Sequence, residues 1–250
     1  MPASPTRPLG WVEPHYRHPV RRIAGREVDY RREIQIRMNF VMSLDGAVTL
    51  DGRSGGLGDP ADRLAMGVLR TLADVVLVGA GTVRAEGYGG LRLRAANRDW
   101  RREHGLPDAP RVAIVSSALE LDPDDPVFAE AEARPLLLTH EAADPARRTA
   151  LAEVAELVDC GADRVDPLRV RDALAARGMP QVLCEGGPHL FGALLDADLV
   201  DELCLSLSPL LVSGSAGRIA QGLTQHTRRM RLVHALPAGE LLLLRYARAR

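Results

Sequence analysis

The sequence predicts an α/β protein built on a mixed sheet, with parallel strands, helices on both faces and an antiparallel edge near the C-terminus. Two observations carry this prediction. From residue 34 onward, short apolar runs alternate with stretches in which apolar residues recur at helical spacing. The last three apolar runs follow one another with no helical pattern between them, which favours antiparallel pairing at one edge.

The individual elements follow from local patterns along the chain. A strand over 34–42 precedes a helix that begins at Pro60, where Asp59 is the expected N-cap and apolar residues recur at helical spacing as far as Leu72. Further strands are expected at 75–78, 112–115, 136–139, 157–160 and 181–184, and helices at 145–156, 167–176 and 190–195. The C-terminal strands are expected at 201–208, 230–234 and 241–246.

The chain divides into an irregular N-terminal arm and one domain. Residues 1–33 hold many prolines and arginines without periodicity, so we expect an arm that packs on the domain or on a partner subunit. Residues 34–250 contain no internal repeat, low-complexity tract or linker. We therefore expect a single domain over 34–250.

Composition places the chain among ordinary globular proteins. It has 250 residues, 46% hydrophobic content and a net charge of −1, which gives no reason to expect a nucleic-acid partner. No apolar run approaches the roughly 18 residues of a membrane span, and no signal peptide begins the chain, so a cytoplasmic location is expected. The three widely spaced cysteines are expected to be reduced and buried, and no metal site is expected.

The absence of lysine excludes several kinds of chemistry. All 32 basic residues are arginine. A Schiff-base mechanism, a pyridoxal phosphate anchor and a P-loop lysine are therefore excluded. The sequence also lacks the GxSxG element of serine hydrolases and the paired HxE and PCxxC elements of zinc deaminases.

Two glycine-rich turns are the strongest signals of a binding site. The segment 184–189 (CEGGPH) lies between an apolar run and a helical pattern, and the segment 79–82 (GAGT) follows another apolar run. Such turns expose backbone N–H groups at a helix start and allow a ligand to come close. Each turn alone is more often a plain strand-to-helix connection, but two of them suggest one phosphate-bearing ligand held across strand ends. Arg84 replaces the third glycine of GxGxxG, which disfavours a standard dinucleotide-binding fold.

Four short segments resemble one enzyme family. They are MSLDG at 42–46, DVVLVGAGTV at 74–83, EGGP at 185–188 and LVDEL at 199–203. In this order they resemble the pyrimidine reductases of riboflavin biosynthesis, which have a dihydrofolate-reductase-like fold. The resemblance implies NADPH as cofactor, a homodimer, and reduction of the ribosylamino group of a phosphorylated aminopyrimidine to a ribitylamino chain.

The resemblance also implies site residues, but it does not name a proton donor. The implied substrate contacts are Asn39, Ser54, Arg70, Arg92 and Glu185. The implied cofactor contacts are Val41, Gly56, Gly79, Gly81, Thr82, Glu86, Gly186, Gly187, Pro188, His189 and Leu190. From the residues alone, Arg70 could equally be the solvated end of a helix, and Glu185 could cap the helix that follows it.

The chain departs from the family at two site positions and in its domain content. Asn39 stands where the family often has a lysine, and Glu86 where it usually has an aspartate. Losing the lysine removes a cation near the substrate and puts the standard phosphorylated pyrimidine in doubt. The family's fused deaminase domain is not found, so we expect deamination to occur on another chain.

Two other functions remain open from the sequence. One is a dihydrofolate or pterin reductase-like activity with the same cofactor. The other is a non-catalytic NADPH-binding regulator, which the neutral Asn39 keeps open.

Overall fold

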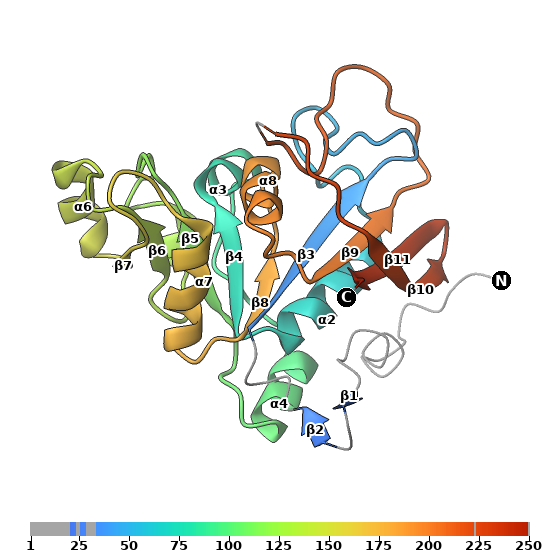
Figure 1. Cartoon of the computed structure of the whole chain (residues 1–250), viewed down its shortest axis with the longest axis horizontal. Coiled ribbons are helices and arrows are strands. Elements are labelled where there is room, and N and C mark those ends of the chain that lie inside the picture. The colour runs from blue at the N-terminus through green and yellow to red at the C-terminus, as the bar shows by residue number, and fades with distance from the viewer. Residues whose placement is uncertain (1–20, 24–25, 29–33, 223, 250) are drawn as a thin grey trace.

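A nine-stranded mixed sheet forms the centre of the computed structural model, which describes residues 21–23, 26–28, 34–222 and 224–249 (Figure 1). The strands lie in the order β10-β11-β9-β3-β8-β4-β5-β6-β7. Every neighbouring pair from β9 to β7 is parallel, whereas β11 is antiparallel to both β9 and β10. The predicted fold class is therefore confirmed, including its antiparallel C-terminal edge. The strands are β3 (Gln35–Met42), β4 (Val75–Gly79), β5 (Arg111–Val115), β6 (Leu136–Thr139), β7 (Glu156–Asp159), β8 (Gln181–Cys184), β9 (Glu202–Leu207), β10 (Met230–Ala238) and β11 (Leu241–Arg248).

The helices cover both faces of this sheet. They are α2 (Pro60–Leu72), α3 (Ala80–Glu86), α4 (Ala95–Glu103), α5 (Pro126–Ala129), α6 (Pro145–Ala152), α7 (Pro167–Ala176) and α8 (Pro188–Asp196). Helix α4 and the single turn of α5 were not predicted, because neither shows a clear apolar period. The helix predicted over 145–156 is too long. The structure ends α6 at Ala152, and Glu156 belongs to β7.

Helix α2 illustrates how local sequence sets an element. The side chain of Asp59 accepts hydrogen bonds from the backbone N–H groups of Ala61 and Asp62, at 2.7 and 3.0 Å, so the expected N-cap is confirmed. Pro60 follows at the first helical position. Buried side chains that include Val68 and Leu69 then face the sheet.

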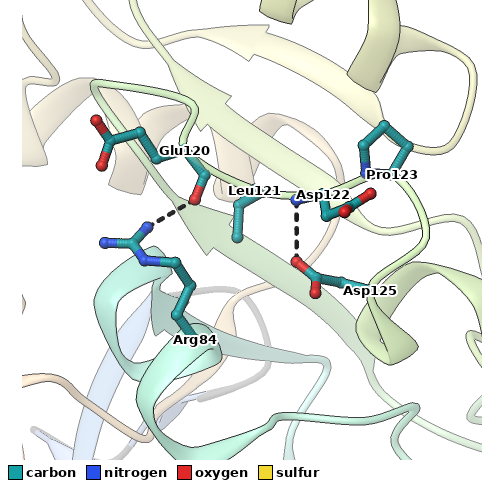
Figure 2. Close-up of a pocket in the computed structure, with 6 residues that line it drawn as sticks. All are labelled: Arg84, Glu120, Leu121, Asp122, Pro123 and Asp125. Carbon is teal, nitrogen blue, oxygen red and sulfur yellow. Dashed lines mark hydrogen bonds between the residues drawn. The ribbon is translucent and has the colours of Figure 1, made fainter.

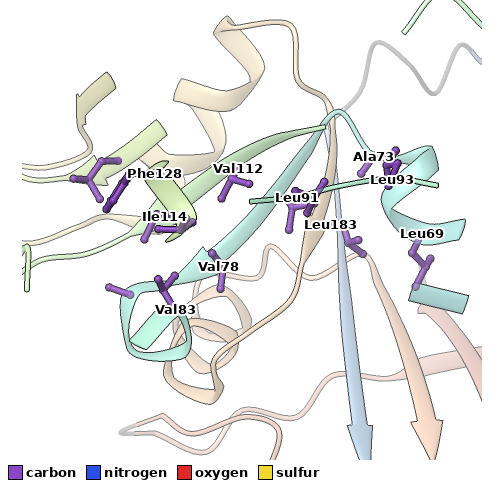
Figure 3. Close-up of a cluster of buried hydrophobic side chains, with 14 of the residues drawn as sticks. Leu69, Ala73, Val78, Val83, Leu91, Leu93, Val112, Ile114, Phe128 and Leu183 are labelled. Carbon is purple, nitrogen blue, oxygen red and sulfur yellow. The ribbon is translucent and has the colours of Figure 1, made fainter. Parts of the chain in front are cut away.

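Two hydrophobic cores lie on opposite faces of the sheet, because neighbouring residues of a strand point to opposite sides. Leu183 of β8 joins the core that contains Leu69 of α2, Val78 and Ile114 (Figure 3). Val182 and Cys184 of the same strand join the second core, which contains residues of α7 and α8. The expected buried, reduced cysteines are confirmed, since Cys160, Cys184 and Cys204 are all free and buried.

The N-terminal arm is described only in part. Arg21–Ile23 (β1) pairs antiparallel with Arg26–Val28 (β2), and the rest of the first 33 residues lies outside the described residues. An irregular arm therefore stays a prediction. Among the described residues, no helix is long and apolar enough to cross a membrane. The same residues contain no group of three or more histidine, cysteine, aspartate or glutamate side chains placed to hold a metal ion.

The loops that follow β3 and β9 lie side by side beyond the carboxyl ends of these strands (Figure 1). The backbone N–H of Leu44 donates to the carbonyl of Leu210 at 2.8 Å. Asp45 accepts hydrogen bonds from Ser43 and from the backbone of Val212 and Ser213, and these bonds lower its pKa to about 2. Asp45 of the MSLDG segment thus joins two loops at the edge of the sheet where parallel strands of α/β proteins hold ligands.

Candidate active site

The two glycine-rich turns predicted from sequence meet at the carboxyl edge of the sheet. The backbone N–H of Gly79 donates to the carbonyl of Gly186 at 2.7 Å. A side-chain Cβ at Gly187 would lie only 2.6 Å from Oγ1 of Thr82, so this approach requires glycine. Gly186 has a φ of +107°, a conformation that favours glycine, and the Gly186–Gly187 peptide bond is cis. Residues about a hundred positions apart therefore form one continuous backbone surface.

Two helices begin at this surface. Helix α3 starts after Gly79 and helix α8 after Gly187, and neither helix has a side-chain cap in the structure as described. The first N–H groups of a helix lack partners within it and carry partial positive charge. In front of Gly81, no atom lies within 4 Å of where a Cβ would stand. This open, amide-lined surface can accept the negative oxygens of a pyrophosphate.

Glu185 forms a partly buried cluster with Arg70 and Tyr88. Nε and Nη2 of Arg70 donate to the two carboxylate oxygens of Glu185 at 2.7 and 2.6 Å, which is a bidentate pair. The hydroxyl of Tyr88 donates to the same carboxylate at 2.8 Å. Burial opposes the charge on Arg70, but the carboxylate of Glu185 outweighs it and raises the arginine pKa above its usual value. Two predicted substrate residues are therefore brought together, and they bind each other.

Asn39 and Val41 of β3 lie on the sheet face that α2 covers. Asn39 is paired with Cys204 of β9, whose side chain belongs to the core that contains Leu69 of α2. Val41 is paired with Ser206 in the same ladder, two residues further along. Since alternate residues of a strand share one face, all four side chains face α2.

The loop after β3 is attached to the end of α3. The backbone N–H of Ser54 donates to Oε1 of Glu86 at 2.8 Å, which joins a predicted substrate contact to a predicted cofactor contact. Glu86, which stands where the family usually has an aspartate, therefore binds the backbone of the loop that follows β3. Gly56 lies in this loop against Leu50, since a Cβ there would be 3.0 Å from the leucine side chain.

Arg92 does not join the Arg70–Glu185 cluster. Its side chain is 67% exposed, and its nearest carboxylate is that of Glu130 at 4.0 Å. His189 is likewise exposed, at the start of α8. Arg92 therefore stays a prediction away from the cluster, and His189 stays a prediction beside the turn at Gly187.

A shallow depression of about 580 Å³ lies beside α3 (Figure 2). Arg84 lines it together with the segment that follows β5, and Nη1 of Arg84 donates to the carbonyl of Glu120 at 2.7 Å. Three carboxylates line it, and none of the predicted site residues does. This depression does not locate the site.

Sequence reasoning missed Tyr88, Asp62 and Ser206. Tyr88 stands among glycines at 87–90, which indicated only a loop. From the sequence, Asp62 is an acidic residue in the first turn of a helix, which is a common position for such residues. Ser206 Oγ donates to Oδ1 of Asp62 at 2.6 Å, and no spacing in the sequence signals a contact between residues 144 apart.

Comparison with known proteins defines the class of this one. Residues 34–244 match the family described as the RibD C-terminal domain. The chain belongs to this family, and the resemblance inferred from four short segments is confirmed. The family is one of reductases of riboflavin biosynthesis, so the chain is a member of an oxidoreductase family.

Three relatives illustrate how far the similarity extends. The 2,5-diamino-6-ribosylamino-4(3H)-pyrimidinone 5′-phosphate reductase of Methanothermobacter thermautotrophicus is 28% identical over 215 residues, covering 84% of this chain and 95% of that one. The enzyme of the same name from Archaeoglobus fulgidus is 27% identical over 178 residues, covering 71% and 81%. A solved pyrimidine reductase-like protein from Corynebacterium diphtheriae superposes with a TM-score of 0.80 at 28% identity, covering 88% of this chain and 94% of that one.

Proposed function

We propose that this protein is an NADPH-dependent reductase that converts a 5-amino-6-(phosphoribosylamino)pyrimidine to its ribitylamino form. Family membership supports a reductase of the riboflavin type. The observation that carries the proposal is the hydrogen bond from Gly79 to Gly186, because it joins two amide-lined turns directly beside Glu185. One surface for a phosphate-rich cofactor and one charged cluster for a polar substrate are thus adjacent.

The chain's residues fit the cofactor. Gly81 and Thr82 on one side, and Gly187 on the other, would hold its pyrophosphate through backbone N–H groups and a hydroxyl, whereas the N–H of Gly79 is used by the carbonyl of Gly186. NADPH, when bound, supplies the hydride for the reduction. The open space at Gly81 would keep the backbone accessible to that ligand, and the absence of a Cβ at Gly187 allows Thr82 to approach.

The substrate would lie against the sheet face that α2 covers. Glu185 can accept hydrogen bonds from pyrimidine N–H groups or from ribosyl hydroxyls, and Arg70 and Tyr88 fix the position of its carboxylate. The ladder of β3 with β8 ends at the pair of Met38 and Cys184, and Asn39 and Glu185 are the next residues of the two segments. Asn39 offers both a donor and an acceptor. The charge of the family lysine is missing at this position, so substrate phosphate must be bound by other groups.

We also propose a homodimer that uses the C-terminal edge of the sheet. β10 is the edge strand, and its Leu232 and Val233 are 48% and 39% exposed. Leu211, in the loop after β9, is 78% exposed. Exposed apolar side chains at a sheet edge favour a partner. A particle of 27.1 kDa in light scattering at micromolar concentration would contradict the dimer.

A steady-state assay tests the catalytic proposal. NADPH oxidation is followed with the phosphorylated ribosylaminopyrimidine, with dihydrofolate and with no substrate, and each reaction is repeated with NADH. We expect turnover with the pyrimidine and a preference for NADPH. Turnover with dihydrofolate alone would favour the pterin reductase, and binding without turnover would favour the regulator. Equal or tighter binding of NADH in calorimetry would refute the cofactor preference.

A further inference from the structure

Asp62 lies in the first turn of α2 and faces the same region of the sheet as the substrate cluster. Oδ1 of Asp62 accepts the hydrogen bond from Ser206 of β9 at 2.6 Å. Ser206 is paired with Val41 of β3, two residues beyond Asn39. The carboxyl group is therefore held over the end of β3, where the substrate is proposed to lie.

Gly58 lies close to the second oxygen of this carboxyl group. A Cβ at Gly58 would stand 2.5 Å from Oδ2 of Asp62, so a side chain there would collide with it. Oδ1 is already used by Ser206. No hydrogen bond to Oδ2 is found among the described residues, so Oδ2 is the oxygen that can carry a proton.

The surroundings of Asp62 raise the pKa of its carboxyl group, and burial is the largest cause. Burial raises its pKa, the hydrogen bond from Ser206 lowers it, and the carboxylates of Asp59 and Glu185 raise it, whereas Arg63 lowers it. From the strands on this face, the charged groups are Glu185 after β8 and the buried cluster of Glu202 with Arg37 and Arg245. From α4, Arg101 binds carbonyls at the far end of the helix.

Asp62 and Glu185 are two acids in one site with different partners. Arg70 binds Glu185 through two hydrogen bonds. Among the residues that the structure describes, no basic side chain forms an ion pair with Asp62. When two neighbouring carboxyl groups have such different surroundings, one remains charged and the other can carry a proton.

We propose that Asp62 is the general acid of the reduction, a role that rests on the proposed function. In the net reaction, hydride forms a new C–H bond at C1′ of the ribosyl group, and the C1′–O4′ bond breaks. O4′ leaves with the electron pair of that bond and takes the proton from Oδ2 of Asp62. The carboxylate that remains regains a proton from water. C1′ is reduced by two electrons and NADPH is oxidised, so atoms and charge balance.

The first test measures the proton without turnover. The carboxyl carbons of the full-length protein are titrated by carbon-13 NMR, and Asp62 is assigned as the resonance that is lost in Asp62→Asn. We expect Asp62 to titrate at higher pH than the exposed aspartates, and Ser206→Ala to move its titration higher still. Titration of Asp62 together with the exposed aspartates would overturn the proposal.

The second test uses the pH dependence of turnover with the ribosylaminopyrimidine. Removing a general acid typically lowers the rate about 100-fold or more. We expect this loss in kcat for Asp62→Asn, with an unchanged Kd for NADPH. The wild-type kcat should fall as pH rises and Asp62 loses its proton, and Ser206→Ala should shift this fall to higher pH. Asp166→Asn alters the N-cap of α7 on the opposite face and serves as the matched control, with an unchanged profile.

The outcomes separate the two proposals. If wild-type protein reduces the pyrimidine but Asp62→Asn keeps its kcat and pH profile, Asp62 is not the acid and the proposed function stands. If wild-type protein reduces no pyrimidine, the proposed function fails and this role fails with it, whatever the NMR titration gives. If Asp62→Asn does not fold, an unshifted profile in Ser206→Ala overturns the assignment.

Discussion

Two arginine–glutamate clusters, one buried and one partly buried, lie at opposite edges of the same sheet. Glu185 follows β8 at the carboxyl edge, where Arg70 binds it at 2.7 and 2.6 Å. Glu202 begins β9 at the amino edge, where Arg37 binds it at 2.7 Å and Arg245 binds it at 3.2 and 2.6 Å. The two clusters use the same kinds of side chain, and their distances are similar.

The surroundings of the two clusters differ. In the Glu202 cluster, Arg37 and Arg245 come from strands on either side of β9, with side chains only 8% and 3% exposed. In the Glu185 cluster, Arg70 comes from a helix and is 20% exposed, next to the glycine-rich turns. The two carboxylates are equally buried, with Glu185 7% and Glu202 8% exposed, so the difference lies in Arg70 and in the neighbouring turns. We expect the Glu202 cluster to have a structural role and the Glu185 cluster to contact a ligand.

The largest expected effect is on stability, in Glu202→Gln. Removing one partner of a buried ion pair leaves an uncompensated charge and costs about 3–5 kcal/mol. We expect a clearly lower urea midpoint, with kcat/KM per folded molecule unchanged. A midpoint equal to that of the wild type would show that this cluster does not hold the three strands together.

The next largest effect is expected on cofactor binding, in Thr82→Val. The substitution keeps the side-chain volume and removes a hydroxyl that is proposed to bind a charged group, at a cost of about 1.5–3 kcal/mol. We expect calorimetry to show NADPH affinity reduced by roughly tenfold or more. Gly81→Ala is a second variant for this test. Its methyl group would lie within 4 Å of no protein atom, and alanine favours the helix, so lower NADPH affinity in this variant would not come from damage to the fold. Unchanged affinity in both variants would mean that this turn is only a helix start.

Glu185→Gln should affect turnover rather than folding. The amide keeps the shape but replaces one acceptor oxygen with a donor, which mismatches Arg70 and the substrate at a cost of about 1–3 kcal/mol. We expect kcat/KM to fall about tenfold or more with little change in NADPH affinity. Loss of NADPH binding with normal turnover at saturating cofactor would instead make Glu185 a structural cap.

The smallest effect is expected for Asp45→Asn, in an exposed loop. Folding lowers the pKa of Asp45 from 3.8 to about 2, so its contribution to stability is complete above the unfolded value and is lost as pH falls through about 2. Wild type and variant should therefore differ slightly in urea midpoint at neutral pH and converge in strong acid. A difference that persists below that pH would contradict the assigned role.

The sequence predicted most of the sheet because its strands are short apolar runs between clear turn signals. It failed at α4, where arginines and other polar residues obscure the helical period. Arg101 of that helix is fully buried and donates to carbonyls of Thr71 and Ala73, which composition alone would not suggest for an arginine.

The sequence predicted where in the fold the candidate site residues lie, but not which of them contact one another. Glycines and a glutamate after strands indicated the carboxyl edge, and the structure joins the two turns there. The pairing of Arg70 with Glu185 spans 115 residues and depends on how α2 packs on the sheet. The sequence did not indicate that Asp62 belongs to the site either, because its burial arises from contact with β9 rather than from its own helix.

The most direct test of the proposed reaction is transfer of deuterium to the ribosylaminopyrimidine in a single turnover, from NADPH that carries deuterium at both C4 positions. We expect a ribitylamino product with one deuterium at C1′, formed in amounts equal to the NADPH oxidised. Glu185→Gln should form it more slowly than Glu202→Gln at equal folded concentration. A product without deuterium, or equal rates in the two variants, would contradict it.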